Sequence, residues 1–218
     1  MNILNQYKKI KQNIEANSFN IPTNLIVVTK GRSLADIQKI INVGHIHFGE
    51  NRVQDSINKW KDILKKNTDI KLHFIGKLQT NKVGDVIPHF SFIHSLDNDK
   101  LALKLSAEEK KLKKTLNYFI QVNLGEENQK SGILKKDLSR FINYCKNDLN
   151  LNIIGLMCLP PINEDSDKYF KELRRLAFDN NLKELSMGMS NDYIPAIKNG
   201  STFVRIGSGI FEEEFNEF

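Results

Sequence analysis

The feature that most constrains the fold is a regular alternation of short β-rich runs with longer helical patterns. The eight β-rich runs span residues 25–29, 46–48, 72–75, 92–94, 118–122, 153–157, 184–186 and 202–206. The helical patterns between them span residues 33–43, 51–66, 80–87, 98–111, 135–146, 165–180 and 191–199. Eight strands with helices between them predict an α/β fold, a single closed (β/α)8 barrel of the TIM type.

The helical assignments rest on apolar periodicity and on residues that are typical of helix ends. In the first pattern, Ile37, Ile40 and Ile41 recur at steps of three and four residues, as on one face of a helix. Ser33 is a typical N-cap, and Gly44 suits the left-handed conformation that ends many helices. These signals predict a helix between the first two strands.

An open, doubly wound sheet is the alternative arrangement for the same elements. No Gly-x-Gly-x-x-Gly motif follows the first strand, and the alternation continues evenly towards the C-terminus, so the pattern favours the barrel. A chain of 218 residues has room for one large domain. We therefore expect one domain over residues 1–218, in which residues 1–20 form an extra N-terminal helix that packs on the barrel.

Composition and cysteine use indicate the cellular setting. Residues 1–17 lack the apolar core of a signal peptide, and no run approaches the ~18 apolar residues that a membrane span needs. Cys145 and Cys158 have neither a metal-type spacing nor a clear pairing partner. We expect a reduced, cytoplasmic protein with no bound metal and no membrane partner.

The formal net charge of +6 raises the hypothesis of a nucleic-acid partner. The lysines are scattered, however, and cluster only at residues 65–66 and 110–114, both in helical patterns with polar faces. Lys, Asn and Ile are abundant along the whole chain, which is typical of a composition bias. We therefore expect no nucleic-acid partner, although steeply salt-dependent binding to DNA or RNA would revive that hypothesis.

Lys30 is the first candidate for a functional side chain. It follows a continuous apolar run, residues 25–28, as expected of a strand buried on both faces. Barrel enzymes carry their chemistry at the C-terminal ends of the strands, so this side chain is expected to enter the barrel mouth. Burial there favours the neutral amine, which can attack an aldehyde. A solvated surface lysine is the ordinary alternative.

A second polar cluster follows the last two predicted strands. Ser190 stands where the helical pattern of residues 191–199 begins, and helix N-termini bind phosphate readily. Gly207 allows close approach of the backbone to an anion, and Ser208 adds a hydroxyl. A capping serine and a turn glycine are the plain alternative. Because the last strand adjoins the first in a closed barrel, one small phosphorylated aldehyde would reach both this cluster and Lys30.

Several longer motifs then carry a family resemblance. They are VTK (28–30), FGEN (48–51), HFIGKLQTNK (73–82), IHSLD (93–97), QVN (121–123), GLM (155–157), LSMGMS (185–190) and GSTFVRIGS (200–208). In this order they resemble the motifs of the pyridoxal phosphate homeostasis proteins, and the resemblance runs from about residue 25 to residue 211. It implies a monomeric barrel similar to the N-terminal domain of alanine racemase.

The resemblance also implies a cofactor, pyridoxal 5′-phosphate, and the residues that hold its two ends. Lys30 would bind the aldehyde as a Schiff base, and Ser190, Gly207 and Ser208 would surround the phosphate. The chain departs from the family directly after the lysine, where residues 31–33 read Gly-Arg-Ser in place of a Thr-Lys-Pro-like continuation. This departure concerns the local loop geometry and leaves the lysine itself in place.

Further residues are assigned by the same resemblance. Arg205 would face the pyridine nitrogen, and Asn51 and Met157 would line the ring. Lys130, in the segment EENQKSG (126–132), aligns with a lysine implicated in secondary cofactor binding in relatives. An exposed loop lysine is the common alternative for Lys130.

The pattern favours a carrier over a catalyst. A charged guanidinium keeps the pyridine nitrogen unprotonated, so the ring accepts electrons poorly. Racemases with this arrangement use two acid–base residues; Lys30 could supply one, and Tyr193 more readily serves packing or phosphate contact than the second. We expect a protein that buffers or delivers the cofactor, with apo-enzymes as candidate recipients, and that is not an enzyme. The alternative is a low-activity racemase acting on small amino acids.

Overall fold

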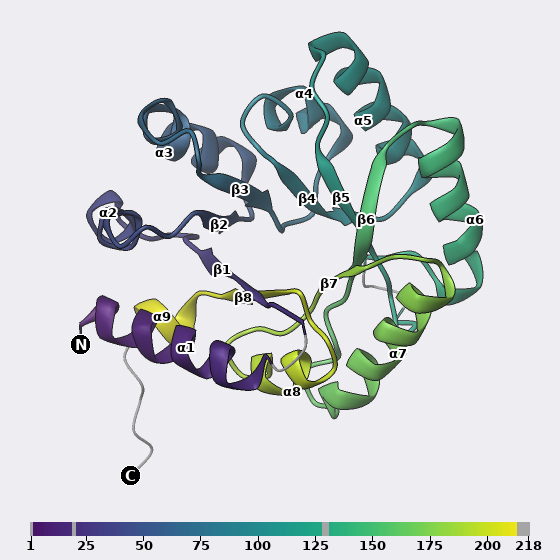
Figure 1. Ribbon diagram of the computed structural model, residues 1–218. Helices are drawn as coiled ribbons and strands as arrows, with labels where there is room; N and C mark the ends of the chain where they lie inside the picture. The colour runs from purple at the N-terminus through teal and green to yellow at the C-terminus, as the bar shows by residue number, and fades with distance from the viewer. Residues whose placement is uncertain (1, 19–20, 128–130, 213–218) are drawn as a thin grey trace.

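The barrel predicted from the alternation of elements is confirmed. A computed structural model describes residues 2–18, 21–127 and 131–212. Eight parallel strands follow one another around a closed barrel, and β1 pairs with both β2 and β8 (Figure 1). The strands are β1 (Asn24–Val28), β2 (His47–Glu50), β3 (Lys71–Phe74), β4 (Phe92–Leu96), β5 (Asn117–Gln121), β6 (Asn152–Met157), β7 (Glu184–Ser186) and β8 (Phe203–Ile206). The open-sheet alternative is therefore excluded.

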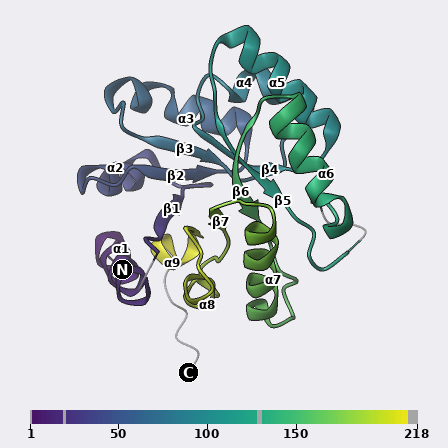
Figure 2. The ribbon, with the colours of Figure 1, turned by 45° about the vertical axis from the view of Figure 1, so that its right-hand side comes forward.

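The helices that follow the strands form a ring outside the barrel, which both ribbon views show (Figures 1 and 2). They are α2 (Leu34–Asn42), α3 (Val53–Lys66), α4 (Val83–Val86), α5 (Asp99–Leu112), α6 (Leu138–Asn143), α7 (Ser166–Asp179), α8 (Tyr193–Lys198) and α9 (Ser208–Phe211). Short 3-10 turns, Thr80–Lys82 and Lys135–Asp137, lead into α4 and α6, and α6 continues as a π-helical turn, Tyr144–Asp148. The last helix, α9, is not expected from the periodicity.

The N-terminal helix α1 (Ile3–Asn17) lies outside the barrel, against the ring of helices. The side chain of Asn2 caps it by accepting a hydrogen bond from the Leu4 amide at 2.9 Å. Its apolar face buries Tyr7 and Ile10, and the helix packs against α2, α8 and α9 (Figure 2). The prediction of an extra helix that packs on the barrel is thus confirmed.

Side chains alternate between the two faces of each strand, which divides the core into two layers. On β1, Leu25 and Val27 belong to the large hydrophobic layer beneath the helices. Ile26 belongs instead to a separate cluster with Phe119, Met157 and Phe203, on the face that looks into the barrel. The barrel interior is therefore packed with side chains, and the site lies at the mouth, above this cluster.

The predicted helix ends are confirmed at α2. The Ser33 hydroxyl accepts a hydrogen bond from the Asp36 amide at 3.1 Å, and Gly44 has a positive φ of 80°. In the part of the chain that the structure describes, no helix is long and apolar enough to cross a membrane.

Candidate functional site

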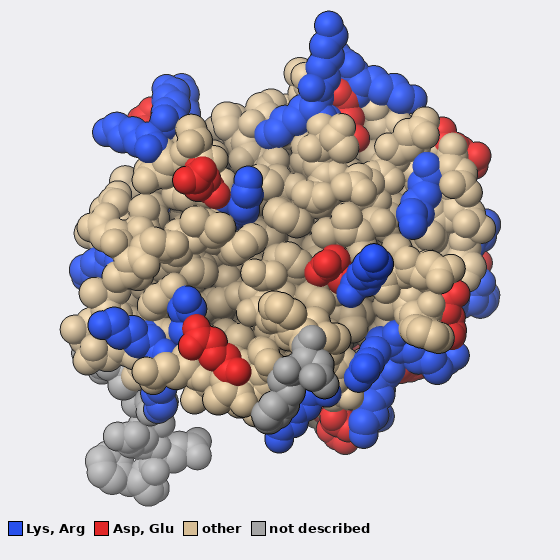
Figure 3. All heavy atoms as spheres, viewed as in Figure 1, with Lys and Arg blue, Asp and Glu red and all other residues tan. Residues whose placement is uncertain are grey.

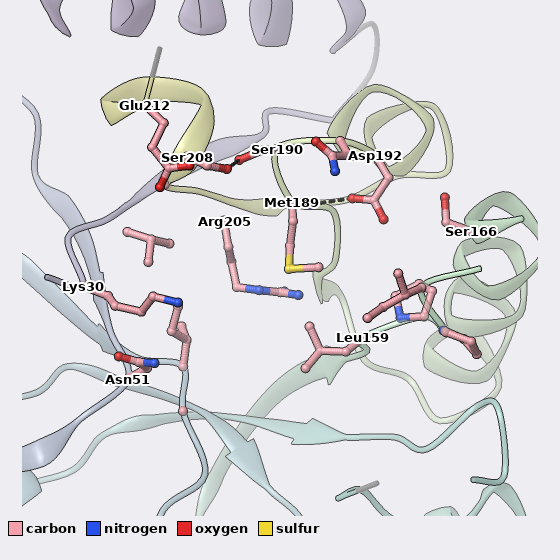
Figure 4. A pocket seen from close by; sticks show the side chains of 18 of the residues that line it. Lys30, Asn51, Leu159, Ser166, Met189, Ser190, Asp192, Arg205, Ser208 and Glu212 are labelled. Carbon is pink, nitrogen blue, oxygen red and sulfur yellow. Dashed lines mark hydrogen bonds between the residues drawn. The ribbon is translucent and has the colours of Figure 1, made fainter. Parts of the chain in front are cut away.

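A cavity of about 710 Å³ lies at the C-terminal ends of the strands (Figure 4). This volume is in the usual range for sites that bind small molecules. Six of the side chains or backbone positions predicted from the sequence line it, namely Lys30, Asn51, Ser190, Arg205, Gly207 and Ser208. The fold therefore brings together residues that are up to 178 positions apart in the chain.

Lys30 extends into the cavity from the end of β1 (Figure 4). The residue before it, Thr29, belongs to a buried polar network. The Glu50 carboxylate, 2% exposed, accepts hydrogen bonds from the Thr29 hydroxyl at 2.6 Å and from the Trp60 indole at 2.9 Å. The Lys59 ammonium donates to the same carboxylate at 2.8 Å and to the Thr29 carbonyl at 2.7 Å. This network holds the backbone that carries Lys30.

The expected burial of the Lys30 side chain is wrong, because the cavity opens to solvent and leaves this residue exposed. The loop that departs from the family pattern forms a tight turn at this point. Gly31 has a positive φ of 69°, and the Arg32 amide donates to the Thr29 carbonyl at 3.1 Å. Glycine suits this left-handed conformation, so the departure is accommodated without moving the lysine out of the cavity.

Asn51 reaches the cavity because its neighbour Gly76, in the loop after β3, has no side chain. A Cβ atom on Gly76 would lie 2.2 Å from the Asn51 carbonyl oxygen and 2.8 Å from its Cα. Only glycine at position 76 therefore permits these two backbone segments to approach so closely. Asn51 then stands beside Lys30 in the cavity (Figure 4).

The two serines of the predicted phosphate cluster meet above Arg205. The Ser208 hydroxyl lies 2.9 Å from the Ser190 hydroxyl, which also accepts a hydrogen bond from the Gly209 amide at 3.2 Å (Figure 4). Gly207 lies against β1, where an added Cβ would come within 3.2 Å of the Val28 Cβ and carbonyl oxygen. This close approach places the ends of β8 and β1 next to each other, as barrel closure requires.

The helix after Ser190 begins later than predicted. The structure places α8 at Tyr193–Lys198, and the Asp192 carboxylate accepts a hydrogen bond from the Met189 amide at 2.6 Å. Asp192 is the residue that precedes the first helical turn, so Ser190 is not the cap. The serine instead belongs to the loop that connects β7 to α8, and its hydroxyl is directed towards Ser208.

Arg205 carries a buried positive charge to the floor of the cavity. Its side chain is 4% exposed, and it donates to the Ser186 hydroxyl at 2.7 Å and to the Cys158 carbonyl at 3.1 Å. Burial lowers the pKa of this guanidinium, although arginine stays charged in proteins. No carboxylate of the described residues forms an ion pair with it. Such a cation favours a ligand atom with a lone pair or a negative charge.

Two predicted site residues lie elsewhere. Met157 does not line the cavity; it is 1% exposed and packs with Phe119 and Phe203 inside the barrel. The expectation that it lines the ring is therefore corrected: β6 directs this side chain into the barrel core. Lys130 lies outside the described residues. Tyr193 accepts a hydrogen bond from Asn13 on α1 at 3.1 Å, which favours the packing role.

Sequence reasoning missed one wall of the cavity. The loop after β6 contributes Leu159 and Ile162, and the loop after β7 contributes Met189, all three exposed. A run of apolar residues and two prolines directly after a predicted strand could have indicated a cavity wall. The wall gives the cavity an apolar side opposite Lys30 (Figure 4).

Charge on the molecular surface is mixed. On the face shown in Figure 3, lysine and arginine side chains are spread out and interspersed with acidic ones. Within residues 2–18, 21–127 and 131–212, no group of three or more His, Cys, Asp or Glu side chains is placed to hold a metal ion.

Comparisons with known proteins agree on one family. The family described as "Alanine racemase, N-terminal domain" matches residues 3–214. A protein of Pasteurella multocida named pyridoxal phosphate homeostasis protein is 34% identical over 226 residues, and the match covers 97% of both chains. A protein of the same name from Synechocystis is 37% identical over 196 residues, covering 86% of this chain and 89% of the relative.

Solved structures show the same relationship. PipY of Synechococcus elongatus without PLP superposes with a TM-score of 0.87 at 31% identity, and PipY with PLP bound superposes with a TM-score of 0.86 at 30% identity. Each match covers 96% of this chain and all of PipY. Alanine racemase of Corynebacterium glutamicum shares the fold, with a TM-score of 0.74 at 14% identity, and the match covers 59% of that longer chain.

Proposed function

The chain belongs to the pyridoxal phosphate homeostasis proteins, and on this premise we propose that it binds pyridoxal 5′-phosphate and buffers or delivers it. The observation that carries the proposal is the cavity at the barrel mouth. An exposed lysine, a pair of serine hydroxyls and a buried arginine without an ion-pair partner among the described residues face it from three sides. These groups match an aldehyde, a phosphate and a pyridine nitrogen.

The residues of the cavity fit the cofactor as follows. Lys30 would be the covalent anchor, since the cofactor would supply an aldehyde to its amine. Ser190, Gly207 and Ser208 are proposed for the phosphate, because hydroxyls and close backbone approach suit an anion. Arg205 would face the ring nitrogen.

Asn51 stands beside Lys30 and is proposed to contact the ring. Met157 supports the site from the barrel core below, without lining the cavity. A role of Lys130 in a secondary cofactor site stays a prediction, because this residue lies outside the described part of the chain.

The role of carrier is supported by the electrostatics of Arg205. Its permanent charge opposes protonation of a ring nitrogen placed against it, which weakens the ring as an electron acceptor. The tyrosine considered for a second acid–base role, Tyr193, is bonded to α1. We therefore propose a protein that holds the cofactor for others and has little turnover of its own.

We also propose that residues 1–218 act as one domain and as a monomer in a reduced cytoplasm. The described cavity is built from one chain, and α1 packs on α8 and α9. Cys145 and Cys158 are free and buried, as expected in a reducing compartment. Sedimentation of the full chain tests the monomer.

Absorbance spectroscopy tests covalent binding. Wild-type protein mixed with pyridoxal 5′-phosphate should gain the absorbance band of a carbon–nitrogen double bond conjugated to the ring. Lys30→Ala should lose the band, and Lys30→Arg, which keeps the charge, should lose it equally. A colourless wild-type protein that takes up no cofactor would refute the proposal.

Two further assays separate carrier from catalyst. Transfer to a pyridoxal phosphate apo-enzyme, with free cofactor trapped, should be faster from the loaded protein than from trapped cofactor alone. Hydrogen–deuterium exchange at Cα of a panel of small amino acids should stay slow at saturating protein. Rapid exchange would favour the low-activity racemase instead.

A further inference from the structure

Three histidines form a hydrogen-bonded row through the interior of the barrel. His47 Nδ1 lies 2.9 Å from His73 Nε2, and His73 Nδ1 lies 2.9 Å from His94 Nε2. His94 Nδ1 lies 2.8 Å from the Ser186 hydroxyl, to which Arg205 donates. The row therefore leads from half-buried His47 at the start of β2 to the guanidinium on the floor of the cavity.

Arg205 sets the direction of every hydrogen bond in this row. A guanidinium can only donate, so the Ser186 oxygen accepts from it. The structure gives the Ser186 hydroxyl two partners among the described residues, Arg205 and His94. Its own proton is satisfied only if it is donated to His94 Nδ1, because the reverse direction would leave a buried hydroxyl proton without an acceptor.

The tautomers of the three rings follow from that first bond. A neutral His94 that accepts at Nδ1 carries its proton on Nε2 and donates it to His73 Nδ1. His73 then carries its proton on Nε2 and donates to His47 Nδ1. Burial lowers the pKa of His73 and of His94 well below the ordinary value, so both rings stay neutral.

Aromatic packing keeps the rings in this geometry. His73 stacks on Phe92 with ring centroids 4.2 Å apart and an angle of 8°, and His94 stacks on Phe119 at 4.3 Å and 20°. Both histidines are fully buried. Rotation of either ring would break a stacking contact as well as two hydrogen bonds, so the row is rigid.

We propose that Ser186, His94 and His73 are positioning residues that orient the guanidinium of Arg205 towards the cavity. Arg205 has two acceptors, the Cys158 carbonyl and the Ser186 hydroxyl. The lone pairs of that hydroxyl are turned to Arg205 because its proton is committed to the histidine row. The inference rests on the proposed function, in which this guanidinium faces the ring nitrogen of the cofactor.

The tautomers can be measured without the cofactor. Long-range proton–nitrogen NMR spectra of the 15N-labelled full chain at pH 7 should show His47, His73 and His94 protonated at Nε2 alone. Ser186→Ala should change the nitrogen signals of His94, because its Nδ1 loses the hydroxyl that donates to it. Ser95→Ala is the matched control, since Ser95 is a buried serine on β4 whose hydroxyl has no hydrogen-bond partner in the described structure. A wild-type His73 or His94 protonated at Nδ1 would overturn the proposal.

Cofactor binding provides the second test. Ser186→Ala should weaken the affinity for pyridoxal 5′-phosphate about tenfold, which corresponds to one hydrogen bond to a charged group. Ser186→Thr, which keeps a hydroxyl, should restore most of the affinity, and Ser95→Ala should leave it unchanged. Equal losses in Ser186→Ala and Ser95→Ala would show a packing role only and overturn the proposal.

A pair of substitutions at His94 distinguishes hydrogen bonding from packing. His94→Asn keeps an acceptor near the Nδ1 position, whereas His94→Leu has a similar size and no acceptor. We expect Asn to bind the cofactor about tenfold more tightly than Leu, although Leu suits the apolar core better. Tighter binding by the Leu variant would contradict the proposal.

The arginine itself supplies the last control. In an Arg205→Gln background, Ser186→Ala should have no further effect on cofactor affinity, because the serine acts through the arginine. A loss that persists in that background would overturn the proposal. A wild-type protein that binds no cofactor would refute the proposed function alone. The tautomer spectra would still show whether each hydrogen bond in the row is donated in the direction from Ser186 towards His47.

Discussion

The Thr29 hydroxyl donates a 2.6 Å hydrogen bond to the buried carboxylate of Glu50, directly beside the lysine that extends into the cavity. The same Glu50 oxygen, Oε1, also accepts hydrogen bonds from the Lys59 ammonium and the Trp60 indole of α3. The start of the β1–α2 loop is thus tied to β2 and α3 by one carboxylate, so the stability of the barrel and the placement of Lys30 depend on the same group.

Glu50→Gln should therefore destabilise the protein. Lys59 is 14% exposed, and loss of its charged partner leaves a largely buried ammonium bonded to a carbonyl and a neutral amide. We expect a loss of about 3 kcal/mol in the free energy of unfolding, measured by urea denaturation. Asp179→Asn breaks the exposed pair with Arg175 on α7 and should cost less than about 1 kcal/mol. Equal losses in the two variants would contradict this expectation.

Gly76→Ala should displace Asn51 and distort the cavity. The new methyl group would lie 2.2 Å from the Asn51 carbonyl oxygen, so one of the two backbone segments would have to move. We expect a loss of about 2 kcal/mol in stability, typical of overpacking, together with weaker cofactor binding. The control is Gly84→Ala in α4, where the nearest atom to the new Cβ is 3.8 Å away. That variant should be neutral or more stable.

Ser208→Ala should weaken binding of the phosphate selectively. Titration with pyridoxal 5′-phosphate and with pyridoxal, which lacks the phosphate, separates the two contributions. We expect about a tenfold loss of affinity for the phosphorylated compound and none for pyridoxal. Ser208 is a cleaner target than Ser190, because the Ser190 hydroxyl also accepts from the Gly209 amide and its loss would disturb the loop. Equal losses for the two compounds would place Ser208 away from the phosphate.

Stability should fall as the pH is lowered from 6.5 to 5, because buried histidines are neutral in the folded chain. Burial lowers the pKa of His45 to about 4 and that of His73 and His94 well below the ordinary 6.5. Below pH 6.5 the unfolded chain therefore binds protons that the folded chain does not, which favours unfolding. Above pH 6.5 this contribution to stability is fully present.

For His45, whose pKa is lowered to about 4, the expected loss over that interval is about 2 kcal/mol, and His73 and His94 add to it in the same direction. Urea midpoints at pH 7.5, 6.5, 5.8 and 5 measure it. His45→Gln should reduce the number of protons taken up on unfolding by about one, which lowers the slope of the unfolding free energy against pH. A midpoint that stays constant from pH 6.5 to pH 5 would show that the rings take up protons while the chain is folded.

The sequence determined the order and type of the elements. Apolar runs such as residues 25–28 and the periodicity of Ile37, Ile40 and Ile41 are local properties, so the barrel and most helix bounds could be predicted from them. Lys30 was also predictable, because the strand ends of a barrel meet at the same mouth, and the family resemblance added Arg205. The start of α8 was missed, since residues 190–192 form a turn before the helix, in which Asp192 accepts a hydrogen bond from the Met189 amide that the sequence does not reveal.

The surroundings of these residues follow from the three-dimensional fold. The bonds of Arg205 to Ser186 and Cys158 join positions 19 and 47 residues away in the chain, and the histidine row joins four strands. Met157 was assigned to the cofactor ring by the family resemblance, yet the pleat of β6 turns it into the barrel core. Side-chain direction and hydrogen-bond polarity depend on barrel closure and register, which no local pattern encodes.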